Sequence, residues 1–138
     1  MGAMMPSDFW SVIGSNVITS RADVTAALDR VEQRLRELDP PDLVAFEGQL
    51  DQNLDALDLS SLASIPVELA GGLVLEQTTD HFLYARCACL LAGRETARSV
   101  LEESERFSDF VAPALQSAES LLYLARKEYE KRTGEPMS

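Results

Sequence analysis

Acidic side chains at helical spacing are the residues of this sequence best placed to do chemistry. Three carboxylates recur four residues apart, which places them on one face of a helix, and a fourth follows three residues later. They are Glu47, Asp51, Asp55 and Asp58. Such a stripe would attract a cationic surface, because complementary potentials raise association rates and select partners. The alternative is a solvated face that keeps the protein soluble.

The charge around this stripe is one-sided. Between residues 37 and 85 there are ten carboxylates and no Lys or Arg, so the rest of the chain has 13 of the 23 acids against all 12 bases. Exposed helix faces usually mix signs, because opposite charges at this spacing stabilise a helix and like charges do not. This base-free segment therefore favours a basic protein partner, bound in the manner of an immunity protein or antitoxin that neutralises a cationic toxin.

A second candidate site involves Asp80, Arg86 and Arg94. Arg86 lies within an apolar helical stretch, where a charge is costly unless it is paired. The functional interpretation is a cleft that binds a small ligand or a substrate, as in a receptor or an enzyme. The structural interpretation is a buried ion pair between Arg86 and a carboxylate of another helix, with Asp8, Glu68 or Glu95 as candidates. A third hypothesis is an assembly subunit that self-associates through exposed apolar surface.

Other residues that often carry chemistry have simpler interpretations. His81 is the only histidine, and no nucleophile or metal ligand stands at a recognisable spacing from it, so we expect it at the surface or at a rim. Cys87 and Cys89 point to different faces of a helix, as expected of buried apolar side chains rather than of a disulfide or a metal pair. Trp10, which follows Phe9, is a candidate interface anchor. The alternative is that these two aromatic residues hold the chain end to the core, and we expect at least one of them to be buried there.

Several function classes lack their sequence patterns. The chain has no calcium loop, phosphate loop, zinc-ligand pair or serine elbow, and no cluster of basic residues free of acids that would bind nucleic acid. The longest weakly apolar stretch, residues 62–75, is interrupted by Pro, Glu and Gly and is too short to span a membrane. We therefore expect no catalytic residue, cofactor or metal, and a non-enzymatic role in the reducing cytoplasm.

Helical periodicity predicts the elements that position these side chains. The expected fold is all-α, a compact bundle of six or seven helices, with an apolar central helix near residues 79–92. The acidic stripe lies on a helix that begins at Asp39-Pro40 and buries a different face. The segment Leu73-Val74-Leu75 is too short to count as a strand. The other expected helices are residues 8–13, 24–38, 94–105 and 113–133. Residues 60–70 are expected to form an irregular segment that Pro66 kinks or delays and that Gly71-Gly72 ends.

The 138 residues fit a single domain, which we expect to comprise residues 6–134. Residues 1–5 resemble an expression leftover with a disordered start, and residues 135–138 are expected to form a tail.

The order of several short motifs resembles the DUF4240 family, a bacterial domain of unknown function. The resemblance begins at Phe9-Trp10-Ser11-Val12-Ile13 and ends in a stretch from Ala125 to Gly134. Between them stand, in the family's order, Leu43-Val44-Ala45-Phe46, Gly71-Gly72, Asp80-His81-Phe82, Arg86 and Gly93-Arg94-Glu95. The chain departs from the family at Thr79-Asp80, where an acidic pair is expected, and at Ala85 and Ala88, where aromatic residues are expected. The resemblance implies a compact bacterial helical domain and no particular activity.

Overall fold

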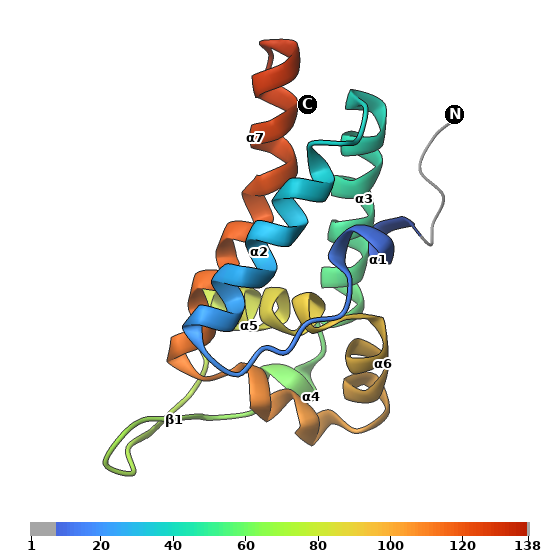
Figure 1. Cartoon of the computed structure of the whole chain (residues 1–138). Coiled ribbons are helices and arrows are strands. Elements are labelled where there is room, and N and C mark those ends of the chain that lie inside the picture. Colours follow the sequence, from blue (N-terminus) through green and yellow to red (C-terminus); the bar gives the residue numbers. More distant parts are fainter. Residues whose placement is uncertain (1–7, 138) are drawn as a thin grey trace.

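A computed structural model describes residues 8–137 of the chain, so the expected leftover at residues 1–5 lies outside the described residues. The described part is helical except for one small hairpin, which confirms the predicted fold class with that exception (Figure 1). The elements are α1 (Asp8–Ile13), α2 (Arg21–Leu35), α3 (Pro40–Ala56), α4 (Ser60–Ala63), β1 (Val67–Glu68), β2 (Val74–Leu75), α5 (Thr79–Ala92), α6 (Arg94–Glu102), the 3₁₀ segments η1 (Ser104–Phe110) and η2 (Pro113–Ser120), and α7 (Leu121–Thr133).

Helix α5 lies at the centre of the molecule, as its apolar sequence predicts (Figure 1). Every residue from Ala85 to Ala92 is buried, and the helix contacts α2, α3, α6, η1 and η2. Cys87 and Cys89 are fully buried free thiols, and burial raises the pKa of each to about 12. Both therefore serve as small apolar side chains, as their spacing indicates.

The three longest helices apart from α5, namely α2, α3 and α7, pack beside one another and extend away from it (Figure 1). Helix α1 packs against α2 and α3. Phe9 is fully buried there, and its ring centroid lies 5.0 Å from that of Phe46 on α3. Trp10 packs edge-on against Phe9 at 4.9 Å and stays partly exposed. The prediction that one residue of this pair belongs to the core is therefore confirmed.

Arginine side chains tie these helices together at their carboxyl ends. The carbonyl groups in the last turn of a helix carry the negative end of its dipole, so a guanidinium group is stabilising there. Three helix ends are capped in this way within the described residues. The donors and acceptors are Arg34 Nη1 to Val12 O of α1 at 2.8 Å, Arg132 Nη2 to Leu35 O of α2 at 3.1 Å, and Arg86 Nη1 to Leu54 O of α3 at 3.0 Å.

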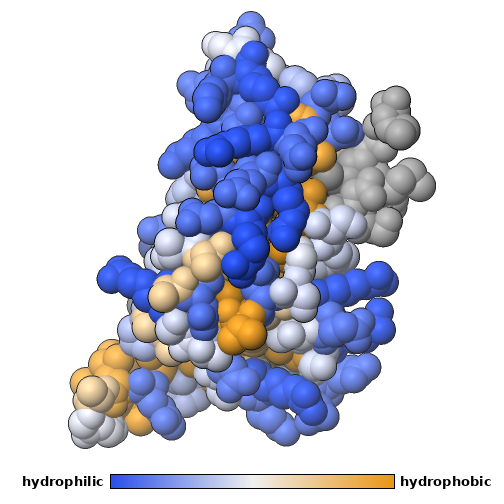
Figure 2. Space-filling model, in the orientation of Figure 1, coloured by the Kyte–Doolittle hydropathy of each residue, from blue (hydrophilic) through white to orange (hydrophobic). Residues whose placement is uncertain are grey.

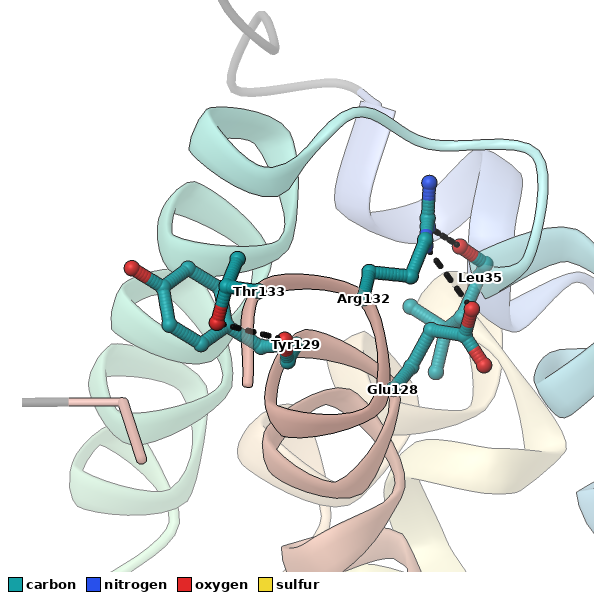
Figure 3. Close-up of polar contacts among 5 residues, drawn as sticks. All are labelled: Leu35, Glu128, Tyr129, Arg132 and Thr133. Carbon is teal, nitrogen blue, oxygen red and sulfur yellow. Dashed lines mark hydrogen bonds and ion pairs between the residues drawn. The ribbon is translucent and has the colours of Figure 1, made fainter. Parts of the chain in front are cut away.

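The carboxyl end of α7 provides the arginine that caps α2, and it also has a cap of its own (Figure 3). Arg132 donates to Glu128 at 2.8 Å as well as to Leu35 of α2, so the guanidinium joins two helices. At the next residue, the Thr133 hydroxyl donates to the Tyr129 carbonyl at 2.9 Å. Gly134 then adopts a left-handed conformation with φ of 76° and ends the helix. The motif near the chain end is thus a helix stop.

The segment over residues 60–70, expected to be irregular, is helical only in its first turn. Helix α4 ends at Ala63 because Pro66 lacks an N–H and disfavours helix in the residue before it. The following residues instead form an antiparallel hairpin in which Val67 pairs with Leu75 and Glu68 with Val74. Its turn requires two consecutive glycines, residues 71 and 72, with φ near +87°.

The boundaries between residues 102 and 121 also differ from expectation. Helix α6 ends at Glu102, and α7 begins only at Leu121, because the intervening chain forms η1 and η2. These 3₁₀ segments still bury the apolar side chains Phe107, Phe110 and Leu115 against the core. The Phe82 ring of α5 meets Phe107 edge-on, with 5.9 Å between centroids. Tertiary packing therefore stabilises them in place of the regular helices that periodicity predicts.

Candidate binding surface

Glu47, the first residue of the predicted acidic stripe, is directed into the molecule. Its exposed fraction is only 7%, because α3 packs against α7 along this face. The Arg126 Nε of α7 donates to its carboxylate at 2.6 Å. Burial raises the pKa of Glu47, and the Arg126 guanidinium offsets part of that shift. The interpretation of Glu47 as a partner contact is thereby corrected, since its charge is already compensated within the fold.

Replacing Arg126 with methionine should destabilise the protein by about 1–2 kcal/mol at neutral pH, because a buried carboxylate loses its partner. The side chain of Arg126 is 55% exposed, which keeps this cost below that of a fully buried pair. A carboxyl whose pKa is raised in the folded state favours folding in its protonated form. The difference between the two proteins in free energy of unfolding should therefore be small below pH 4.5 and grow as the pH rises.

The control for this prediction is the same substitution in a Glu47→Gln background. Glutamine carries no charge, so Arg126→Met should then cause a loss that does not depend on pH. Urea denaturation at several pH values measures all four proteins. A loss in the Glu47 protein that stays constant from pH 4 to pH 8 would contradict the assigned role of this pair.

The other three residues of the stripe are exposed. Asp51 and Asp55 lie one turn apart on α3, and Asp58 follows the end of that helix. Asp51 adds to the effect of Glu47 in raising the pKa of Arg126, so it lies within the electrostatic reach of that cation. Asp55 and Asp58 enter no ion pair among the described residues. The stripe is thus compensated at its amino-terminal end and uncompensated at its carboxyl-terminal end.

Most carboxylates of the base-free segment, residues 37–85, also enter no ion pair among the described residues. Of its ten carboxylates, Glu47 alone enters an ion pair of the part of the chain that the structure describes. Apart from Arg126, the basic side chains that enter ion pairs of the described residues pair with acids of their own regions, for example Arg36 with Glu32 and Arg106 with Glu103. The nine acids that enter no ion pair there are Glu37, Asp39, Asp42, Asp51, Asp55, Asp58, Glu68, Glu76 and Asp80.

The alternative cleft of Asp80, Arg86 and Arg94 is not formed. Asp80 is exposed in the first turn of α5, and Arg94 is exposed just beyond its last turn. Since α5 has 14 residues, these two lie roughly 20 Å apart at 1.5 Å per residue. Arg86 between them is buried at 8% exposure, so the three side chains cannot converge on one ligand.

The structural interpretation predicts an ion pair for Arg86, and neither Glu68 nor Glu95 forms one with it; the side chain of Asp8, the third candidate, lies outside the described side chains. None of the ion pairs between described side chains includes it. Its guanidinium instead donates to Leu54 O and lies over the Phe82 ring, with 4.3 Å from Cζ to the centroid. A carbonyl group and an aromatic face replace the predicted carboxylate, and both are favourable to a cation. Arg86 therefore has a structural role that joins α5 to the end of α3.

Two neighbouring hollows are lined by residues of α6 and η1. They have volumes of about 310 and 530 Å³ and share Thr96, Asp109 and Phe110 among their lining residues. Within residues 8–137, no group of three or more His, Cys, Asp or Glu side chains is arranged to hold a metal ion.

His81 is half-buried, and its Nε2 donates to Val111 O at 2.7 Å, so it is a structural rim residue, as its position predicts.

The hairpin adds residues that sequence reasoning missed. Leu73, Val74 and Leu75 are 56%, 53% and 48% exposed, and they form the one run of consecutive large apolar side chains on the described surface. In Figure 2 apolar atoms gather at the projecting corner where Figure 1 places the hairpin. The pattern that identifies it is a Gly-Gly turn followed by β-branched and aliphatic residues.

Comparison with models of protein families identifies the family of this chain. The model of the family described as a protein of unknown function, DUF4240, matches residues 4–131, which is nearly the whole chain. The chain belongs to the DUF4240 family. The matched range contains all the motifs of the expected resemblance except the helix stop at Thr133-Gly134, which lies just beyond it. No curated protein and no solved structure matches the chain.

The structure gives roles to several of the residues that carry the family resemblance. Phe9 and Phe46 form a core contact, Arg86 caps α3, and Gly93 turns the chain between α5 and α6. These roles stabilise the fold. These particular motif residues therefore belong to the scaffold of this chain. No helix among residues 8–137 has the length and apolar character required to cross a bilayer.

Proposed function

We propose that this DUF4240 protein is a non-enzymatic, acidic binding module of the bacterial cytoplasm whose partner is a basic protein, as an immunity protein or antitoxin binds a cationic toxin. The observation that carries the proposal is the set of nine carboxylates in the base-free segment that have no ion-pair partner among the described residues. Exposed acids that are left uncompensated by the fold can be paired by another molecule at little desolvation cost.

The contact surface retained from the predicted stripe consists of Asp51, Asp55 and Asp58. They are exposed side chains on or directly after α3. A fixed group of like charges produces a potential that attracts a cationic partner over about 10 Å at 0.1 M ionic strength. Such steering increases association rates by 10- to 1,000-fold at low salt and is lost at high salt.

The test is the salt dependence of association with a partner isolated from the source cells at low salt, identified and purified. We expect the association rate constant to fall at least about tenfold between 20 mM and 500 mM NaCl. The triple variant Asp51→Lys, Asp55→Lys, Asp58→Lys should reduce the low-salt rate by a similar factor.

A matched control changes the net charge by the same amount elsewhere. Glu102, Glu105 and Glu130 are exposed, lie outside the base-free segment and enter no ion pair of the described side chains. Reversal of these three charges should change the rate much less, because the surface involved is different. An association rate that is flat with salt, or that falls equally in both triple variants, would refute the proposed contact surface.

A further inference from the structure

The hairpin β1–β2 is an apolar element that the fold itself does not use. Of the residues in its two strands, only Val67 is buried, while Val74 and Leu75 are about half exposed. Exposed apolar residues that occur singly are ordinary, but a contiguous exposed patch marks an interaction site. The remaining large apolar residues on the described surface, such as Val17, Val44 and Leu101, lie on separate elements.

The backbone of the hairpin is suited to strand addition. It projects from the helical body (Figure 1), and its two strands pair only with each other within the described structure. Each strand of a two-stranded sheet has an outer edge whose N–H and C=O groups can pair with an added strand. The side chains next to the β2 edge are the exposed Leu73, Val74 and Leu75, whereas β1 holds Val67 against the body. The β2 edge is therefore the better docking edge.

The charge around the hairpin selects the occupant. Glu68 on β1 and Glu76 directly after β2 are both exposed, and neither enters an ion pair among the described side chains. The hairpin also lies wholly inside the base-free segment. A second copy of this chain would bring four of these carboxylates together, which is unfavourable for the self-association otherwise expected of an apolar patch. An apolar segment flanked by Lys or Arg would cover the exposed apolar side chains of the hairpin and would also pair with its two carboxylates.

We propose that the hairpin Val67–Leu75 is the docking element for an extended apolar segment with flanking Lys or Arg in the partner protein. The segment adds as a strand along β2, its apolar side chains cover Leu73, Val74 and Leu75, and its basic flanks pair with Glu68 and Glu76. This inference rests on the proposed function in that the partner is cationic. It goes further by naming the element that binds and the conformation of the segment bound.

The experiment uses the full chain and a synthetic peptide probe, KKVTVTVKK, whose alternating β-branched residues favour an extended strand. Binding is followed by the backbone amide shifts of the isotope-labelled protein in NMR spectra, which identify the site residue by residue. We expect shifts confined to residues 67–76. Two peptide controls, EEVTVTVEE and KKVTPTVKK, should bind at least about tenfold more weakly, because the first reverses the charge and the second removes a backbone donor from the added strand.

Protein variants separate the hairpin from other exposed apolar residues. Leu73→Ser and Val74→Thr should weaken peptide binding about tenfold when combined. The matched control is Leu101→Ser on α6, whose side chain is 47% exposed and therefore resembles Leu75 in exposure. That variant should bind within about twofold of the unchanged protein. All three positions are exposed, so the helical circular dichroism of the variants should stay unchanged.

The outcomes distinguish this inference from the proposed function. Lysine-peptide shifts at residues 51–58 with none in the hairpin would overturn the docking element and leave the proposed acidic contact surface standing. Equal binding of the lysine and glutamate peptides at the hairpin would overturn the basic flanks of the docked segment, whereas the proposed function fails only when association with the partner is flat with salt. Hairpin shifts that arise on concentrating the protein alone would identify a second copy as the occupant. The absence of any shift at millimolar peptide would overturn the strand addition itself.

Discussion

Replacing Gly93 with alanine is expected to lower the free energy of unfolding by about 2–4 kcal/mol. Gly93 joins α5 to α6 with φ of 120° and ψ of 175°, a backbone conformation available essentially only to glycine. A Cβ atom there would lie 3.0 Å from the carbonyl oxygen of Gly14 and 3.2 Å from Cα of Ser15. Both neighbours are backbone atoms, so relief of the clash requires a shift of the chain.

The same corner of the molecule is held by hydrogen bonds that such a shift would stretch. The backbone N–H of Asn16 donates to Ala92 O at 3.1 Å, and its side-chain amide donates to Leu91 O at 2.7 Å. These bonds satisfy the last carbonyl groups of α5, the central helix. Thermal or urea denaturation monitored by circular dichroism measures the loss of stability.

Gly48→Ala is the matched control for Gly93→Ala. Gly48 lies inside α3, is exposed, and a Cβ atom added to it would meet nothing within 4 Å. Alanine in a helix interior is more favourable than glycine by roughly 0.5–1 kcal/mol, so this variant should be more stable than the unchanged protein. If Gly93→Ala were no less stable than Gly48→Ala, the corner at Gly93 would tolerate a side chain, and the prediction would be contradicted.

Replacing Arg86 with alanine is the second change expected to have a large effect, a loss of about 2–4 kcal/mol. The side chain is buried at the centre of the fold between Phe82 and the end of α3, so its removal leaves a cavity. The substitution also takes the cation away from the Leu54 carbonyl group and from the Phe82 ring. Denaturant unfolding of the two proteins at one pH provides the comparison.

Arg86→Met separates packing from charge. Methionine fills much of the same volume, and it removes a buried charge whose desolvation is unfavourable. We expect this variant to lose no more than about 1 kcal/mol, because exchanging a buried charged group for an apolar group of similar volume is often close to neutral. A methionine variant as unstable as the alanine variant would show that the bond to Leu54 dominates and would refute the packing argument.

These two residues, Gly93 and Arg86, belong to the motifs through which the chain resembles its family, and both act on the scaffold. Their burial or backbone conformation leaves no accessible functional group at either position. The proposed binding function instead rests on exposed residues, namely Asp51, Asp55 and Asp58 and the hairpin. This difference between scaffold residues and surface residues follows the general rule that one fold can carry many different functional sites.

The sequence by itself determined the helical class, the central position of α5 and the asymmetry of charge. Apolar residues on every side of residues 82–92 require burial on every side, so the surrounding helices follow from that stretch alone. The family membership likewise follows from the order of short motifs along the chain. Periodicity failed at the hairpin, because two strands of two residues each are too short to show an alternation.

Only the tertiary structure decided which charges are compensated. Glu47 and Asp51 have the same spacing on α3 as Asp51 and Asp55, yet Glu47 alone is buried against α7 and paired with Arg126, 79 residues away. Arg86 looked equally suited to a carboxylate, and the packing gave it the Leu54 carbonyl group and the Phe82 ring. The physical reason is that a sequence fixes the face of a helix on which a charge lies, while its desolvation and its partners depend on which distant element covers that face.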